Sequence, residues 1–142
     1  MLFPAMAPSA SQAVSSAGSG NVVIGWKLDR EQRKELLQQF PPQFSNVVAD
    51  HVTLKSRASP AAPLPNETHG EIVGRTSDNK GVEAMVVRIE GTTDRPGGGT
   101  YHITWSLADG RRAKESNDVL AGRGWEPIEL PMPVKLEPAR FR

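Results

Sequence analysis

Two of the three histidines of this chain stand in the same local pattern, in which a threonine follows two positions after the histidine. The first pair is His51 with Thr53, and the second is His102 with Thr104. Imidazole takes up and releases protons near neutral pH, and a threonine hydroxyl can donate a hydrogen bond to an anion. Two such pairs could therefore transfer protons on two sides of one charged substrate group.

The residues around both pairs indicate β-strands, over 46–56 and 100–107. Residues i and i+2 of a strand share a face, so each histidine lies beside its threonine, and the apolar residues between them face the other way. This arrangement is typical of a half-buried cleft wall. The alternative is that two unrelated histidines lie in a sheet, and that the threonines reflect only their preference for strands.

Three residues near the two pairs are candidates for substrate binding. Lys55 and Ser106 each lie four residues after a histidine on the same expected face, so either could touch a bound substrate. Each could also be an ordinary solvated strand end. Tyr101 has the opposite parity to His102, and its hydroxyl needs a partner if it is buried.

The composition excludes several classes of function. A formal net charge of +1, from 17 basic and 16 acidic residues, is too low for a protein that follows a long nucleic acid through its phosphates. There is no cysteine, which excludes disulfides and thiolate metal sites, and we expect neither a metal nor a cofactor. No apolar run is long enough to cross a bilayer and no secretory signal begins the chain, so we expect a cytoplasmic monomer without membrane contact.

The pattern along the chain predicts one domain over 21–142 after a disordered tail over 1–20, which is rich in Ala, Ser and Gly. A strand over 21–29 is followed by a helix over 30–40, and a hairpin turns at 77–81. Ser116 is expected to cap a short helix that ends before two glycines, and the proline-containing stretch 127–138 suits only an edge strand or a strand rim. Two residues are expected in the core, Trp26 and Trp105.

These elements predict an α+β fold with mainly antiparallel sheets. Each histidine-containing strand is associated with one helix, so we expect two similar lobes that face each other across a central cleft. The stretch "PGGG" at 96–99 leads into a strand instead of a helix N-terminus, and we interpret it as a turn without a phosphate-binding role. Arg75, Arg88 and Arg95 could contact nucleic acid, although charges on the solvated face of a hairpin need no such role.

The paired "HVT" and "HIT" motifs on strands, with "GWKLD", "FPP" and "ESNDVL" around them, resemble the two-histidine phosphoesterase superfamily. That superfamily includes RNA cyclic phosphodiesterases and 2′,5′ RNA ligase-like proteins, and this chain is most similar to its compact, bacterial, RNA-repair-like branch. The resemblance covers about residues 21 to 137. The two motifs are closer together here than in the larger members of the superfamily.

The resemblance implies a metal-independent phosphodiesterase that hydrolyses 2′,3′-cyclic phosphates or 2′,5′ phosphodiester bonds of RNA ends or small nucleotides. It implies that His51 and His102 are the acid and the base, in an order that the sequence leaves open, and that Thr53 and Thr104 bind the phosphate. Two alternatives remain: an RNA-end ligase or transferase that uses the same site, and a nucleotide- or RNA-binding module without catalysis. Arginine would serve simple phosphate binding better than histidine, which weighs against the module.

Overall fold

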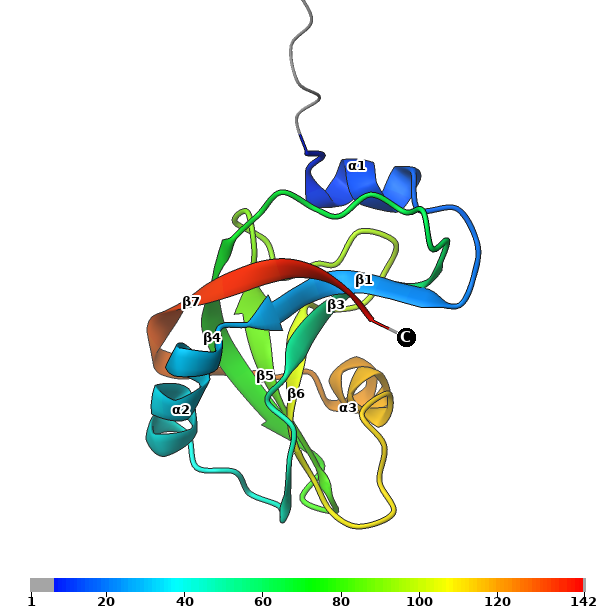
Figure 1. Cartoon of the computed structure of the whole chain (residues 1–142). Helices are drawn as coiled ribbons and strands as arrows, with labels where there is room; N and C mark the ends of the chain where they lie inside the picture. Colours follow the sequence, from blue (N-terminus) through cyan, green and yellow to red (C-terminus); the bar gives the residue numbers. More distant parts are fainter. Residues whose placement is uncertain (1–6, 142) are drawn as a thin grey trace, which may run out of the picture.

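Ten secondary-structure elements follow one another along the part of the chain that the computed structural model describes, residues 7–141 (Figure 1). Every strand pairing is antiparallel, and the predicted α+β class is confirmed. None of the helices within residues 7–141 is long and apolar enough to cross a membrane. In chain order the elements are α1 (Ala10–Ser15), β1 (Val22–Leu28), α2 (Arg30–Gln39), β2 (Asn46–Val47), β3 (His51–Ala58), β4 (His69–Ser77), β5 (Val82–Arg88), β6 (His102–Leu107), α3 (Glu115–Arg123) and β7 (Glu126–Phe141).

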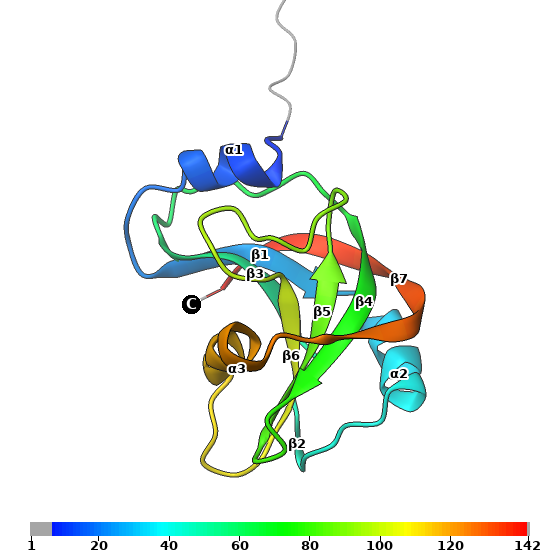
Figure 2. The same cartoon turned by 180° about the vertical axis from the view of Figure 1, so that it is seen from behind.

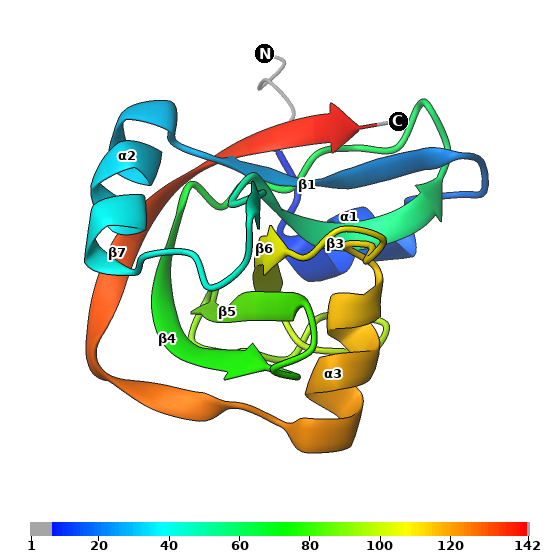
Figure 3. The same ribbon diagram turned by 90° about the horizontal axis from the view of Figure 1, so that it is seen from below.

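The seven strands form one sheet that closes into a barrel instead of two lobes. Their order is β2-β6-β3-β1-β7-β4-β5, and a further pairing of β5 with β6 closes six of them into a ring. Helices α2 and α3 lie outside the ring on opposite sides, as the view from below shows (Figure 3). The prediction of two lobes is therefore wrong. Periodicity identifies strands, but it does not tell which distant strands pair.

The interior of the barrel is filled by large aromatic and aliphatic side chains. Trp26 and Trp105 are fully buried, as predicted, and each indole N–H donates to a backbone carbonyl, of Glu67 and Phe40 respectively, at 2.8 Å. Tyr101 packs edge-on against Trp26, with the ring centroids 5.7 Å apart. Because the indole N–H groups are satisfied, both tryptophans stabilise the core without leaving a buried donor unpaired.

The long strand β7 lies between β1 and β4, so the prediction of an edge strand is wrong. Its two halves pair on different sides: residues 136–141 pair with β1, and residues 126–135 pair with β4. Each half thus has one side that needs no ladder hydrogen bonds, and prolines such as Pro133 and Pro138 are tolerated there. The prolines correctly predicted positions without backbone N–H donors. They could not show that β1 and β4 each pair with one half of β7.

The segment before β1 is ordered from residue 7, contrary to the disorder predicted for residues 1–20; residues 1–6 lie outside the described residues. Ser9 and Gln12 form a capping box at the start of α1. Ala10 and Ala13 are buried, and the Ala10 backbone N–H donates to the carboxylate of Glu67 at 3.0 Å. Small side chains let the short helix approach the barrel closely. The disorder prediction counted only large apolar residues, so it missed this packing.

Helix α3 packs on the outer face of the barrel against β5 and β4, through the buried side chains of Val119 and Leu120. Figure 2 shows the helix beside β6 on this side of the barrel. The helix runs through Gly122 to Arg123 and is capped by Gly124, so the predicted end before both glycines is two residues too early. It begins at Glu115 after Lys114, so Ser116 is not its cap. The Ser116 side chain is instead buried against β6, in contact with one of the two motif threonines described below.

Candidate functional site

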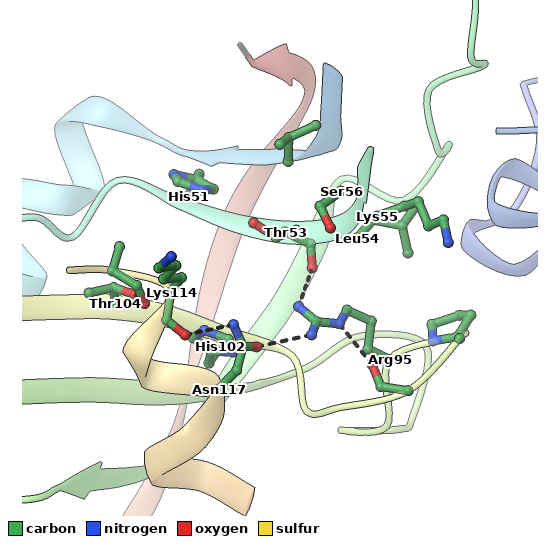
Figure 4. Close-up of a pocket in the computed structure, with 15 residues that line it drawn as sticks. His51, Thr53, Leu54, Lys55, Ser56, Arg95, His102, Thr104, Lys114 and Asn117 are labelled. Carbon is green, nitrogen blue, oxygen red and sulfur yellow. Dashed lines mark hydrogen bonds between the residues drawn. The ribbon is translucent and has the colours of Figure 1, made fainter. Parts of the chain in front are cut away.

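The two His-x-Thr pairs lie on neighbouring strands and face the same pocket. Strands β3 and β6 pair antiparallel at Val52 and Ile103, which are both fully buried. In an antiparallel ladder this register sets His51 opposite Thr104, and Thr53 opposite His102, on the outer face of the barrel. All four line one pocket of about 380 Å³ (Figure 4). The two pairs are therefore brought together by a single register, and not by two lobes closing.

The imidazole of His102 is buried and has a defined tautomer. Its Nδ1 lies 2.8 Å from the backbone carbonyl oxygen of Thr100, which can only accept, so Nδ1 carries a proton. Nε2 is then the free ring nitrogen. Burial lowers the pKa of His102, and the nearby charges of Arg95 and His51 lower it further, against the opposing effect of the Thr100 carbonyl. His102 is thus favoured in its neutral form.

The second imidazole, His51, is more exposed and is held by a carboxylate. Its Nδ1 lies 2.9 Å from Oδ2 of Asp50, whose other oxygen accepts from Arg30 at 2.8 Å. Partial burial alone would raise the pKa of Asp50, but the hydrogen bonds from Arg30 and His51 outweigh it and lower the pKa. The ring of His51 also packs on Phe141, with centroids 4.6 Å apart. Asp50 is therefore a carboxylate beside His51, and it can compensate a positive charge there.

The two threonines differ in what their hydroxyls contact. Thr53 is half-buried on β3 and lines the pocket. Thr104 is buried, and its hydroxyl lies 2.9 Å from the Ser116 hydroxyl and 3.3 Å from the Ala113 carbonyl oxygen. Thr104 therefore joins β6 to the start of α3. Phosphate binding by Thr104 stays a prediction, and it requires the hydroxyl to leave these partners.

Of the three neighbouring candidates, only Lys55 lines the pocket. Ser106 is fully buried, donates to Glu83 at 2.7 Å and accepts from the backbone N–H of Phe44. A register shift between the pairs Glu83–Ser106 and Ala84–Thr104 adds one residue to β6, and the bulge turns Ser106 to the other face. Tyr101 is buried in the barrel core, where burial and the charge of Glu67 raise its pKa. The predicted substrate contacts of Ser106 and Tyr101 are wrong.

Arg95, a sequence candidate for nucleic-acid contact, lines the pocket. Several other lining residues were not predicted from the sequence. They come from the glycine-rich turn and from the start of α3, and they are Pro96, Gly97, Gly98, Ala113, Lys114 and Asn117. Arg95 reaches across the pocket: Nη2 donates to the Asn117 side-chain oxygen at 3.0 Å, Nη1 to the Thr53 carbonyl at 3.5 Å, and Nε to the Gly98 carbonyl at 3.0 Å (Figure 4). Residues 96–98 of the turn thus line the pocket, and the interpretation of 96–99 as a turn is confirmed.

One signal in the sequence could have identified this turn. Gly99 has a φ of +87°, and a Cβ there would lie 2.7 Å from Nη2 of Arg95. The last glycine of "PGGG" is therefore needed both for its backbone conformation and for the path of the arginine side chain. A run of three glycines that follows an arginine and a proline is consistent with a loop folded around the arginine side chain.

Within residues 7–141, no three His, Cys, Asp or Glu side chains gather as a set of metal ligands. The arrangement can hold an anion between two imidazoles, with one ring neutral and the other beside a carboxylate. No protein-family model, no curated protein and no solved structure matches this chain.

Proposed function

We propose that this pocket hydrolyses 2′,3′-cyclic phosphates or 2′,5′ phosphodiester bonds of RNA ends or small nucleotides by general acid and base catalysis. The observation that carries the proposal is the pair of imidazoles on adjacent strands, each held through Nδ1 and both lining one pocket. Hydrolysis of a phosphodiester needs one group that takes a proton from water and another that gives a proton to the leaving oxygen. Two imidazoles in different environments supply both.

His102 is the general base in this proposal. Its Nδ1–H is committed to the Thr100 carbonyl, so Nε2 of the neutral ring has a free lone pair. Burial and the neighbouring cation lower its pKa, which keeps the ring neutral at physiological pH. A base must be unprotonated before the reaction begins, so His102 fits this role better than the role of the acid.

His51 is the general acid. When it is protonated, its positive charge faces the Asp50 carboxylate at 2.9 Å, and Nε2–H is left to point to the leaving oxygen. Asp50 is itself held by Arg30 at 2.8 Å, which fixes the carboxylate in place. Asp50 is therefore a positioning residue, since it acts on the substrate only through His51.

The reaction can be written as one balanced displacement at phosphorus. Nε2 of His102 takes a proton from water, and the water oxygen forms a bond to phosphorus. The bond from phosphorus to the 2′ oxygen breaks, and Nε2–H of His51 gives its proton to that oxygen, which leaves a 3′-phosphate. If the 3′ oxygen leaves instead, the product is a 2′-phosphate. Identifying the product therefore shows which ribose oxygen faces His51 in the bound substrate.

Negative charge that builds on the non-bridging oxygens needs donors in the pocket. The Thr53 hydroxyl lines the pocket, and the nearby guanidinium of Arg95, which keeps its charge at all physiological pH values, adds a favourable positive charge. These groups supply stabilisation that is often supplied by a metal ion in other phosphodiesterases. We therefore expect full activity in the presence of a chelator.

The direct test is to incubate the protein with a nucleoside 2′,3′-cyclic monophosphate and, separately, with a 2′,5′-linked dinucleotide. Hydrolysis of either supports the proposal. Joining of RNA ends without hydrolysis would favour a ligase or transferase, and tight binding without turnover would favour a binding module. Activity that is abolished by a chelator would contradict the mechanism.

The pH dependence gives a prediction about His102. Because the base must be neutral and its pKa lies below the ordinary histidine value of 6.5, kcat/KM should stay high below pH 6.5. It should fall only when the pH passes the lowered pKa of His102. Replacing Arg95 with Gln removes a charge that lowers this pKa, so the acid limb should move to higher pH.

The measurement is kcat/KM of both proteins between about pH 4 and about pH 9. Arg123→Gln, which removes a charge at the far end of α3, is the matched control and should leave the acid limb in place. An acid limb at or above the ordinary histidine value in the unmodified protein would contradict the role of His102 as a buried base.

Asp50→Asn should lower kcat about tenfold or more, with little change in KM. The amide still fills the space, but it cannot compensate the charge of a protonated His51 as the carboxylate does. Steady-state kinetics on a cyclic monophosphate measure the effect. Asp118→Asn on the exposed face of α3 is the control. If Asp50→Asn raised KM alone, Asp50 would act in substrate binding and not in proton transfer.

A further inference from the structure

The pocket continues past the histidines to an end that carries an excess of positive charge. Lys55 and Arg95 lie at this end, Lys114 lies beside Thr104 and His102, and none of the described residues that line the pocket is a carboxylate (Figure 4). The chain as a whole has a net charge of only +1. A second pocket, of about 400 Å³, has two arginines balanced by Glu83 and Glu126. The excess of cations is therefore a property of the histidine pocket, and not of hollows in this protein generally.

Arg95 has no ionic partner among the contacts that hold it. Its three hydrogen bonds go to the carbonyl oxygens of Thr53 and Gly98 and to the side-chain amide oxygen of Asn117, which are all neutral. Burial lowers the pKa of Arg95, because it removes water that would stabilise the positive charge. A guanidinium has five N–H donors, so two remain for a ligand. A half-buried cation with neutral neighbours and free donors is suited to an anion.

Lys55 lies beyond the motif on the same strand as His51 and Thr53. Its side chain extends toward the end of the pocket away from His51 (Figure 4). Positions two apart on a strand are about 6.6 Å apart. This spacing is comparable with the separation of successive phosphates along an extended nucleotide chain. An anion near Lys55 and Arg95 would therefore lie one phosphate away from an anion at Thr53 and His102.

The backbone of the glycine-rich turn leaves this end of the pocket open. Gly97 and Gly98 line it with positive φ values of 91° and 119°. A Cβ at Gly98 would meet nothing within 4 Å, so the space beside it is free for a ligand. Three hydrogen bonds also hold the turn in place. The Arg95 backbone N–H donates to the Gly99 carbonyl, the Gly98 backbone N–H donates to the Arg95 carbonyl, and Nε of Arg95 donates to the Gly98 carbonyl.

We infer that the cationic end, defined by Lys55, Arg95 and Gly98, binds a second phosphate on the 5′ side of the nucleotide that is cleaved. This inference rests on the proposed phosphodiesterase function. When a cyclic phosphate lies between His51 and His102, the next phosphate that the same nucleotide can offer is attached to its 5′ carbon. It is either a 5′-monophosphate or the phosphodiester that links the preceding nucleotide. The substrate is thus a 5′-phosphorylated nucleotide or the last residue of an RNA, and not a bare nucleoside.

The experiment compares kcat/KM for three substrates with the same base: a nucleoside 2′,3′-cyclic phosphate, the same compound with a 5′-phosphate, and a dinucleotide that ends in a 2′,3′-cyclic phosphate. We expect the 5′-phosphorylated compound to react roughly tenfold or more faster than the bare nucleoside, because it adds charge-assisted hydrogen bonds. The dinucleotide distinguishes the two sources of the phosphate. An equal gain shows that a phosphodiester suffices, and a smaller gain shows a preference for a terminal phosphate.

Lys55→Gln should reduce the advantage of the 5′-phosphate, measured as the ratio of kcat/KM between the two mononucleotides. Lys34→Gln, on the exposed surface of α2, is the matched control and should keep the ratio of the unmodified protein. Raising the ionic strength should also reduce the ratio, since exposed charges are screened. Both measurements use ratios, so a general loss of folded protein cannot imitate the effect.

The outcomes separate this inference from the proposed function. If all three substrates are hydrolysed with the same kcat/KM, the second phosphate site is wrong and the phosphodiesterase proposal stands. If a 5′-phosphate helps but Lys55→Gln does not change the ratio, the placement at the cationic end is wrong. If none of the three is hydrolysed, and a 2′,5′-linked dinucleotide is not hydrolysed either, the proposed function itself is wrong.

Discussion

Replacing His102 with alanine should reduce kcat for a 2′,3′-cyclic monophosphate by about a hundredfold to ten-thousandfold, the range that general base catalysis contributes. The residue is buried on β6 with Nδ1 held at 2.8 Å from a backbone carbonyl, so no other side chain can easily take the place of its Nε2. His51→Ala should cause a loss of the same order. Single-turnover kinetics at saturating substrate measure the chemical step without product release.

The third histidine provides the control for both variants. His69 is exposed at the start of β4, away from the pocket, and His69→Ala should keep full activity. The double variant that lacks both His51 and His102 should be scarcely less active than either single variant, because residues that act together give non-additive losses. Activity that survives His102→Ala in folded protein would contradict the mechanism.

Trp105→Ala should destabilise the fold by about 3–5 kcal/mol, the usual cost of removing a large aromatic side chain from a packed core. Trp105 is fully buried, and its indole N–H donates to the Phe40 carbonyl at 2.8 Å. The variant leaves a cavity in the barrel and an unpaired carbonyl where α2 ends. It also removes the side chain at the bulge of β6, between Thr104 and Ser106.

Chemical denaturation followed by circular dichroism measures this loss as a change in the free energy of unfolding. Leu130→Ala is the comparison, since this leucine is 73 % exposed and its removal should change stability by less than about 0.5 kcal/mol. Trp105→Phe should lie between the two, because it keeps most of the volume and loses the hydrogen bond. A loss below about 1 kcal/mol for Trp105→Ala would show that the core is not packed around this residue.

Local patterns in the sequence predicted the types of most elements. Alternation of apolar residues predicted strands at 21–29 and 100–107, and the structure has β1 and β6 there. The same alternation predicted that Val52 and Ile103 face the core, while each motif histidine and its threonine share the other face. These features depend on residues two to four positions apart, so a single chain contains the information.

Features that depend on distant partners were predicted poorly. The pairing of β5 with β6 that closes the barrel, and the division of β7 between β1 and β4, place residues far apart in sequence side by side. The bulge in β6 is a mismatch between two strands, so alternation within one strand could not show that Ser106 turns inward. α1 depends on close packing of small residues. A composition rich in Ala, Ser and Gly predicted disorder there, because it contains few large apolar side chains.

The sequence by itself determined that two histidines would each lie beside a threonine on a strand, since side-chain parity follows from local backbone geometry. Only the tertiary structure decided that the two pairs meet, through the register that joins β3 and β6 at Val52 and Ile103. It also decided their difference, since His102 is buried near Arg95, while Asp50 beside His51 is held by Arg30 from α2. Burial and charge at a side chain depend on segments brought from elsewhere in the chain, and the fold alone brings them.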